Sequence, residues 1–298
     1  MTAATVGVLE PVALPTTVAR PSSLLRRALR LWRTRIGVLL VLVLVLVAVV
    51  GPFVAPHTPS DFVGTPNTGP APGRLLGTDY LGQDVWSRFL YGGRTLLVTA
   101  VVATAVGLVI GVAIGMVAAY SRNLLDDVLM RALDVLMAFP QIMLALVAVA
   151  VVGPQAWVIV AAIAITTAPR VARVTRAAAQ PVVERDFIAA AEAMGLSRWR
   201  ILTGELLPNI LSPLLVEASL RLTYSIGVIA SLAFLGLSAD PNGADWGVMI
   251  QQNRIALTVQ PWGVVTPVLA IGLLTMGTGL IGDGISRAAA GIDRAKDA

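Results

Sequence analysis

The sequence predicts an all-α membrane protein with six transmembrane helices and both termini in the cytoplasm. The chain has 298 residues, of which 56% are hydrophobic and only 13% charged, and its mean hydropathy is +0.81. About a quarter of the residues in a soluble domain are charged. Apolar windows of about 20 residues, the length that crosses the hydrocarbon core, occur at roughly 36–55, 95–120, 129–152, 157–178, 211–236 and 262–282.

The arginine distribution predicts the orientation, because cytoplasmic segments of membrane proteins are rich in Lys and Arg. With the N-terminus inside, the inner segments carry 17 of the 22 basic residues. Arg221 falls within a span, and the outer segments carry Arg74, Arg88, Arg94 and Arg254. The first apolar window is too long for a signal peptide and lacks the usual small-residue cleavage site, so we expect a retained helix.

Residues 1–35 form a cytoplasmic N-terminal segment in this interpretation. Residues 1–20 are typical of a flexible tail. Residues 22–35 predict a basic amphipathic helix, which either lies along the inner leaflet or simply extends the first span. The remaining organisation is a first span with an outer segment (36–94), a core domain (95–283) and a cytoplasmic C-terminal tail (284–298).

The first four spans carry two features that bear on packing. Gly107, Gly111 and Gly115 recur every fourth residue, and this stripe predicts close contact with a neighbouring helix. Near the inner end of the fourth span, Pro169 precedes three arginines at three-residue spacing, for which we favour lipid headgroups over a partner protein as contacts: Arg170, Arg173 and Arg176.

The fifth span contains Glu217 and Arg221, four residues apart and therefore on one helix face. Charged residues inside a span usually face protein or water. We favour a structural pair near the inner interface, and a position beside the transport path is the alternative.

The outer segments predict two platforms. Residues 55–73 should run extended, and Asp79 or Asp84 can cap a short helix that Gly92 ends, with Asp84 and Arg88 on one face. The aromatic residues suit either an interfacial anchor or a surface for an outside partner. They are Trp86, Phe89 and Tyr91 in the first platform, and Trp246 and Trp262 in the second.

The composition also excludes several kinds of chemistry. The chain has no cysteine, and its single histidine, His57, stands between prolines, where we expect an ordinary loop residue. A Walker-type phosphate loop needs Gly-Lys-Ser/Thr, whereas the only lysine, Lys296, follows alanine. We therefore expect no catalytic residue, bound cofactor or metal on this chain, and no nucleic-acid partner. Any ATP must be bound by another polypeptide.

Residues 184–210 form a polar loop between the fourth and fifth spans, on the inner side. Asp186 is expected to be the N-cap of a two-turn helix, and Gly195 its C′ residue. The less polar side should carry Phe187, Ile188, Ala191 and Met194. A short helix with a small surface and a glycine break is suited to a cleft on another protein.

This loop resembles the cytoplasmic coupling loop of ABC importer permeases. The matching residues are Ala190, Ala191, Gly195, Leu207 and Pro208, while Ala189 stands where the general motif has Glu, and Glu192 or Glu184 can substitute. Further segments resemble the C-type subunits of the dipeptide/oligopeptide/nickel permeases, over roughly residues 35–294. They are 76–97, 170–195, 234–250, 261–271 and 279–294, the last with Gly-Ile-Asp-Arg where the family often has Asp-Pro-Arg.

The resemblance implies a type I permease fold in the bacterial cytoplasmic membrane. It implies a second homologous permease subunit, two ATPase domains that bind ATP and Mg, a substrate-binding protein outside, and contact with membrane lipid. Peptides are the expected substrate, with nickel or haem as alternatives. The residues that it assigns to ATPase coupling are Asp186, Phe187, Ala189, Ala190, Ala191, Glu192, Gly195, Leu196, Leu207 and Pro208.

Two functions of other classes remain as alternatives. An ion-gradient secondary transporter usually shows broken or charged helices at mid-membrane and inverted repeats, of which we find only the Glu217–Arg221 pair. A structural or assembly protein without transport is the other. Co-purification separates them, because only the importer predicts ATPase subunits and a second permease.

Overall fold

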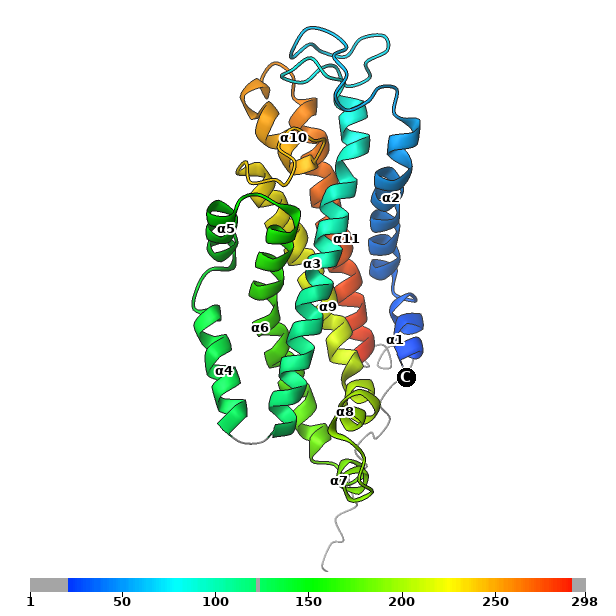
Figure 1. Ribbon diagram of the computed structural model, residues 1–298. Helices are drawn as coiled ribbons and strands as arrows, with labels where there is room; N and C mark the ends of the chain where they lie inside the picture. Colours follow the sequence, from blue (N-terminus) through cyan, green and yellow to red (C-terminus); the bar gives the residue numbers. More distant parts are fainter. Residues whose placement is uncertain (1–20, 122–123, 291–298) are drawn as a thin grey trace, which may run out of the picture.

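The computed structural model describes residues 21–121 and 124–290 and shows an elongated helical bundle (Figure 1). The predicted tail 1–20 and the segment 291–294 lie outside the described residues. The long helices are α2 (Trp32–Val54), α3 (Val85–Ser121), α6 (Ala156–Val183), α9 (Leu207–Phe234) and α11 (Trp262–Ala290). The shorter ones are α1 (Pro21–Ala28), α4 (Leu124–Met137), α5 (Gln141–Val152), α7 (Asp186–Ala193), α8 (Arg198–Arg200) and α10 (Trp246–Asn253).

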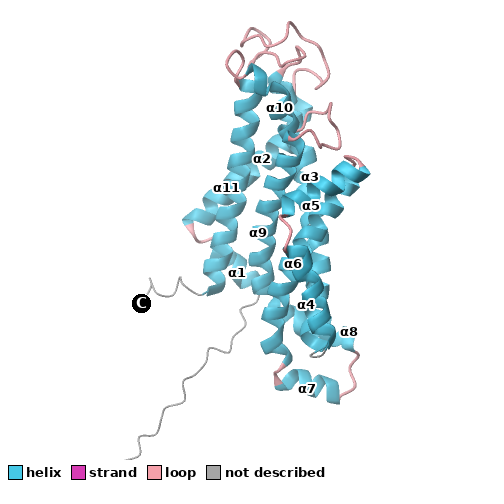
Figure 2. Ribbon diagram, turned by 90° about the vertical axis from the view of Figure 1, so that its left-hand side faces the viewer, coloured by secondary structure: helices cyan, strands magenta, loops and turns pink. Residues whose placement is uncertain are grey.

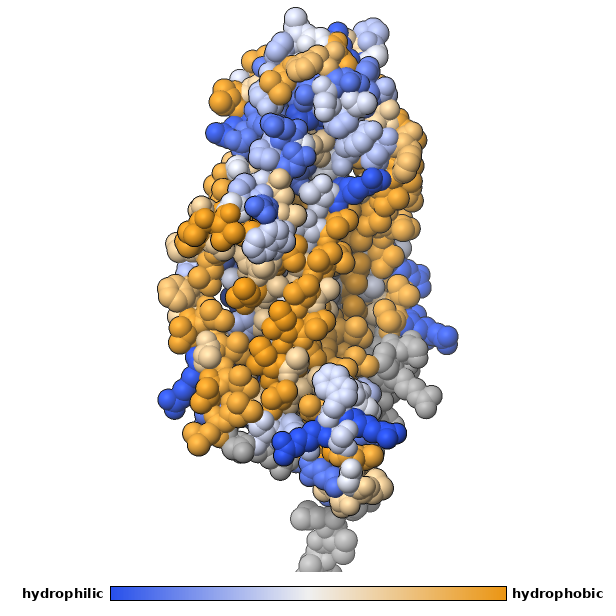
Figure 3. All heavy atoms as spheres, in the orientation of Figure 1, coloured by the Kyte–Doolittle hydropathy of each residue, from blue (hydrophilic) through white to orange (hydrophobic). Residues whose placement is uncertain are grey.

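The described residues contain five helices long and apolar enough to cross a membrane, and a sixth span if α4 and α5 count as one. The prediction of six apolar segments is confirmed, but the third is not one straight helix. α4 and α5 meet at 80°, because Pro140 lacks an N–H and its ring excludes helical conformation from the residue before it. Figure 3 shows apolar residues over the middle of the bundle and hydrophilic residues toward both ends.

Several predicted boundaries are wrong. α3 begins at Val85 and runs through Gly92 without ending there. The predicted helix 22–35 is broken after Ala28, and α1 packs against the ends of α9 and α11 while α2 begins at Trp32. α9 is preceded by a π-helical turn, Ile201–Leu206. Pro208, the second residue of α9, has no N–H with which to continue the α-helical hydrogen bonds.

The glycine stripe of α3 forms a close contact with a neighbouring helix, as predicted, and that helix is α6. A Cβ atom on Gly111 would lie 2.6 Å from the Cβ of Val171, and one on Gly115 would overlap the carbonyl oxygen of Ala172. α3 and α6 therefore pack backbone against backbone, and this seam positions the ends of both helices. α2 and α11 use the same device, since a Cβ on Gly37 would lie 2.7 Å from the carbonyl oxygen of Gly277.

The connecting segments gather at two opposite ends of the bundle (Figure 2). Residues 55–84 and α10 lie at one end, which we call the cap end. α7 and α8 lie at the other end, toward which α1 and the end of α11 also point. The inner and outer segments of the sequence prediction are thus separated in space.

Candidate functional site

α7 is a two-turn helix at the end of the bundle opposite the cap end, where it projects beyond α6 and α9 (Figure 1). Arg185, in extended conformation, holds the N-cap position, and Asp186 is the first helical residue. The prediction of Asp186 as N-cap is therefore wrong by one residue. The Asp186 carboxylate still lies in the first turn of α7, where its negative charge interacts favourably with the helix dipole.

The end of α7 is a Schellman motif, as the glycine predicted. Gly195 has φ +75° and donates its N–H to the carbonyl of Glu192 at 2.9 Å, and Leu196 donates to the carbonyl of Ala191 at 3.2 Å. Only glycine adopts this left-handed conformation without a steric penalty. A Cβ on Gly195 would meet no other atom within 4 Å, so the glycine is needed for the chain reversal and not for space.

The two sides of α7 differ from the predicted division. Ile188 and Ala191 are 2% and 3% exposed and pack on Ile201 of the π-helical turn. Phe187 and Met194, predicted on the same less polar side, are exposed. The exposed part of α7 therefore carries apolar side chains as well, among them the exposed alanines Ala189, Ala190 and Ala193.

A hydrogen bond joins α7 to the end of α3. The Tyr120 hydroxyl donates to the Glu192 carboxylate at 2.6 Å. Both residues border a cavity of about 300 Å³, which is also lined by Val183, Glu184, Arg185 and Ala189. α7 is thus fixed to α3 through Glu192, and through Ile201 to the π-helical turn that precedes α9. No sequence signal pointed to Tyr120 or Ile201, because neither belongs to the motif of the coupling loop.

The remaining residues of the predicted site lie further along the chain. Leu207 and Pro208 form the first turn of α9, where Leu207 packs against a buried cluster and Pro208 is exposed. Glu217 and Arg221 are both buried on one face of α9, with Arg221 Nε 2.8 Å from Glu217 Oε1. The Arg221 guanidinium also lies 5.0 Å from the ring centre of Tyr224. These two charged residues pair with each other and are remote from α7 in sequence.

Two arginines of α6 form ion pairs with α4, which the sequence did not predict. Arg176 binds Asp126 of α4 through two contacts of 2.6 and 2.5 Å, and Arg173 pairs with Asp134 of the same helix. The prediction that these arginines face lipid headgroups is therefore wrong for Arg176, which is held by α4. Arg173 and Arg170 are exposed, and for them the headgroup contact stays a prediction. Two ion pairs thus join α4 to α6 below the bend at Pro140.

The cap end is held by a buried polar network. Asp84 caps α3 by accepting the N–H and the hydroxyl of Ser87 at 2.9 and 2.6 Å, as predicted. Arg88 pairs with Asp79 and not with Asp84, and it donates to the carbonyl of Gly243 at 3.0 Å. Asp84 is engaged with the backbone of its own helix, so Arg88 is free to join residues 79 and 243.

Trp246 is fully buried, and the prediction that it belongs to an interfacial platform is wrong. Its indole N–H donates to the carbonyl of Phe89 at 2.9 Å, and its ring stacks on that of Phe89. The ring packs against Gly92 and Gly93, where a Cβ would lie 2.6 and 2.7 Å from ring atoms. Gly92 therefore serves close approach and not helix termination. His57 lies in a loop as expected, and its backbone N–H donates to the hydroxyl oxygen of Ser87 at 3.1 Å.

Asp245 precedes α10 and caps it by accepting the N–H groups of Gly247 and Val248. Burial raises the pKa of Asp245 to about 6. Because the folded protein binds this proton more tightly than the unfolded chain, the carboxylate costs stability above pH 6, and that cost diminishes as the pH falls toward 4. A shift of about two pH units corresponds to about 3 kcal/mol.

Asp245→Asn keeps the cap without the buried charge. We expect it to raise the thermal unfolding midpoint at pH 7.5, and we expect this advantage to shrink as the pH is lowered to 5. Asp245→Ala, which removes the cap, should lower the midpoint by an amount equivalent to about 1 kcal/mol or more relative to the Asn variant. Melting curves of the purified protein between pH 5 and 7.5 provide the measurement. A difference between Asn variant and parent that does not change with pH would contradict the buried-charge account.

Within residues 21–121 and 124–290 no group of three or more His, Asp or Glu side chains could hold a metal ion. The predicted coupling residues that lie together in the structure are those of α7, which Tyr120 and Ile201 hold in place.

Comparisons with known proteins identify the family. The family model described as the binding-protein-dependent transport system inner membrane component matches residues 111–290, which include α6, α7, α9 and α11. The chain belongs to this family. It is accordingly a multi-pass permease subunit of an ABC importer in the inner membrane, and the predicted resemblance is confirmed.

Individual relatives match over most of the chain. A putative peptide transport system permease protein of Brucella suis is 37% identical, covering 87% of this chain and 88% of its own length. The di/tripeptide transport system permease protein DppC of Pseudomonas aeruginosa is 36% identical, covering 84% of each chain. The glutathione transport system permease protein GsiD of Pectobacterium atrosepticum is 36% identical, covering 83% of each.

The fold is that of a solved ABC importer permease. A chain from the inward-facing MetNI methionine ABC transporter superposes with a TM-score of 0.51 at 21% identity, covering 65% of this chain and 93% of that chain. The all-helical type I permease architecture predicted for this family member is thereby confirmed.

Proposed function

We propose that this permease subunit translocates small peptides, and that α7 is the helix through which separate ATPase domains move it. The proposal includes a second homologous permease subunit, two ATPase domains that bind ATP and Mg, and a substrate-binding protein at the cap end. The cap end is then extracytoplasmic, and α7 and both termini are cytoplasmic. The chain itself carries no catalytic residue and binds no cofactor.

The observation that carries the coupling role is the attachment of α7. Its inner side is fixed by Ile188 and Ala191 on Ile201, and Glu192 binds Tyr120. Its outward side presents alanine and isolated apolar side chains, which can enter a cleft on a partner protein. A force applied to α7 therefore reaches α3 and α9 together. α3 is packed backbone to backbone on α6, so the motion can pass to a large part of the bundle as a rigid unit.

The substrate proposal rests on the relatives, whose names specify peptides, di- and tripeptides or glutathione. The described residues hold no metal-binding cluster that would favour nickel as cargo. A transport path must release its substrate, so it does not require tightly binding side chains.

Purification of the assembled transporter tests this function. We expect the affinity-tagged chain to co-purify from bacterial membranes with a second permease and ATPase subunits. In proteoliposomes with the binding protein, the assembly should import a dipeptide or tripeptide only when MgATP is present on the α7 side. The chain alone should show no ATP hydrolysis. Uptake of nickel or haem in place of peptide, or ATP turnover by the single chain, would overturn the respective part of the proposal.

A further inference from the structure

Two cavities meet at one arginine on the surface between α2 and α3. The first is a groove of about 340 Å³ that is lined by aliphatic side chains and ends at Arg94. The aliphatic residues are Val45, Ala48, Val49, Leu97, Val98, Val101 and Val102. The second is a polar cavity of about 380 Å³ between α3 and the loop 240–244, and Arg94 lines it too.

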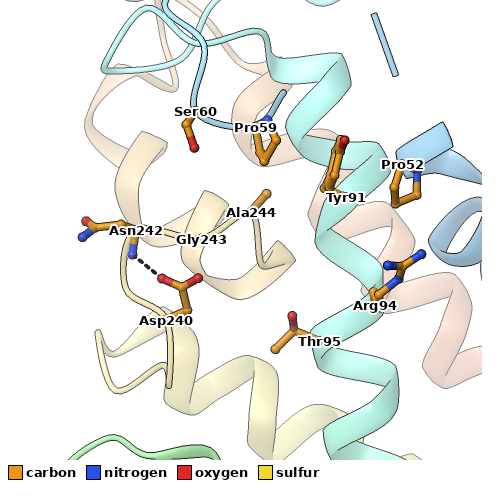
Figure 4. A pocket seen from close by; sticks show the side chains of 10 residues that line it. All are labelled: Pro52, Pro59, Ser60, Tyr91, Arg94, Thr95, Asp240, Asn242, Gly243 and Ala244. Carbon is orange, nitrogen blue, oxygen red and sulfur yellow. Dashed lines mark hydrogen bonds between the residues drawn. The ribbon is translucent and has the colours of Figure 1, made fainter. Parts of the chain in front are cut away.

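Figure 4 shows how the polar cavity is built around α3. Arg94 and Pro52 lie on one side of the helix, whereas Asp240 and Asn242 lie on the other, with Tyr91 and Thr95 between them. The Asp240 carboxylate accepts the N–H of Asn242 at 3.3 Å. Asp240 is therefore on the opposite wall from Arg94 and has a backbone partner of its own.

Arg94 has no carboxylate partner. The ion pairs found among residues 21–121 and 124–290 do not include it, and its guanidinium makes one long contact of 3.4 Å to the carbonyl of Val49. Arg88, on the same helix, is by contrast buried against Asp79. An exposed guanidinium without a carboxylate partner, placed at the boundary of apolar and polar surface, can donate several hydrogen bonds to an anion of tetrahedral or planar shape.

We propose that this double cavity is a binding site for one glycerophospholipid of the leaflet at the cap end. The phosphate binds Arg94, the glycerol and headgroup occupy the polar cavity, and one acyl chain lies in the groove between α2 and α3. The arrangement of a hydrocarbon-lined groove, a cation and a polar cavity in this order matches the order of the parts of a phospholipid. A soluble peptide or sugar would leave the apolar groove unfilled.

The position of the groove gives this lipid a structural consequence. Ala48 lines the groove and also packs on Gly93: a Cβ added to Gly93 would lie 3.0 Å from the Cβ of Ala48. Gly93 in turn contacts the buried ring of Trp246. A bound acyl chain therefore supports the α2–α3 contact directly beneath the cap network.

Native mass spectrometry of the assembled transporter, after removal of loosely held lipid, tests the site. The probes are phosphatidylglycerol and diacylglycerol with the same acyl chains, so that they differ in the phosphate-containing headgroup. We expect phosphatidylglycerol to bind the parent assembly more tightly than diacylglycerol. Arg94→Gln should weaken phosphatidylglycerol binding about tenfold, the effect of losing one charge-assisted hydrogen bond, and should leave diacylglycerol unchanged. Arg254→Gln, at another exposed arginine of the cap end, is the matched control.

A second variant tests the groove independently of charge. Val98→Trp fills the groove at an exposed position and should reduce binding of both lipids, whereas Val109→Trp, exposed on the same helix outside the groove, should reduce neither. Unchanged phosphatidylglycerol binding in both Arg94→Gln and Val98→Trp would overturn the proposal. Loss of the second permease subunit from Val98→Trp, with lipid binding by the remainder unaltered, would also overturn it, since the groove would then be a protein interface.

Discussion

Gly115→Val is expected to prevent stable folding of the permease. A Cβ at this position overlaps the carbonyl oxygen of Ala172 and lies 2.6 Å from the Cβ of Thr175. The overlapped atom belongs to the backbone of α6 and cannot rotate away, so α3 and α6 must separate. Separation removes contacts along the whole glycine stripe, including those of Gly107 and Gly111. Overpacking usually costs about 1–3 kcal/mol, and a backbone clash belongs at or above the upper end.

The measurement is the yield of monodisperse protein in detergent, together with its thermal unfolding midpoint. Gly272→Val in α11 is the matched control, because a Cβ there meets no atom within 4 Å. We expect the control to behave as the parent does and the Gly115 variant to aggregate or unfold at a much lower temperature. Equal midpoints for the two variants would contradict the close backbone packing of α3 and α6.

Ala190→Trp is expected to abolish ATP-driven uptake without unfolding the chain. Ala190 is exposed on the outward side of α7, so a larger side chain meets nothing within the permease itself. If the outward side of α7 enters a cleft of an ATPase partner, as proposed, the indole has no room there and α7 can no longer bind. Loss of one well-packed contact of about 3 kcal/mol would lower coupling more than a hundredfold.

Ala190→Ser provides the comparison at the same position, since it keeps the small volume. Peptide uptake and ATPase activity are measured in proteoliposomes, and the melting midpoint of the purified chain is measured in parallel. We expect the Ser variant to retain uptake and the Trp variant to lose it, with equal melting midpoints. Normal uptake by the Trp variant would show that the outward side of α7 is not enclosed by a partner.

Local patterns in the sequence predicted those features whose causes are local. The glycines of α3 recur every fourth residue and therefore share one face, which is sufficient to predict the seam with a neighbouring helix. Gly195 follows two helical turns and ends them in a left-handed residue, a rule that needs only adjacent residues. Asp84 likewise caps the helix that follows it directly.

Features that depend on distant partners could not be predicted. The ion pairs of Arg173 and Arg176 could not be predicted, because their acidic partners are distant in sequence. Asp134 lies 39 residues before Arg173, and Asp126 lies 50 residues before Arg176. The sequence around Gly92 is compatible both with a helix end and with close packing of an aromatic ring. Only the position of Trp246 in the fold shows that Gly92 allows close packing. The supports of α7 were missed for the same reason, since Tyr120 belongs to another helix.

The division of α7 into two sides failed for a different reason. The less polar side was predicted from four apolar residues: Phe187, Ile188, Ala191 and Met194. Composition alone cannot distinguish an apolar residue that packs within the chain from one that is exposed. The helical positions of Ile188 and Ala191 face Ile201, and Phe187 and Met194 do not. Exposure of an apolar side chain at the end of a membrane protein is the signal that distinguishes the two groups.

Site-specific photo-cross-linking tests the coupling role of α7 most directly. A photoreactive phenylalanine analogue replaces Phe187 on α7 or, as the control, Phe62 at the cap end, both of which are exposed. In the assembled transporter we expect the analogue at position 187 to cross-link to an ATPase subunit, with a yield that changes when ATP is added. The analogue at position 62 should give no such product. An ATPase cross-link from position 62, or none from position 187 in an active assembly, would contradict the account.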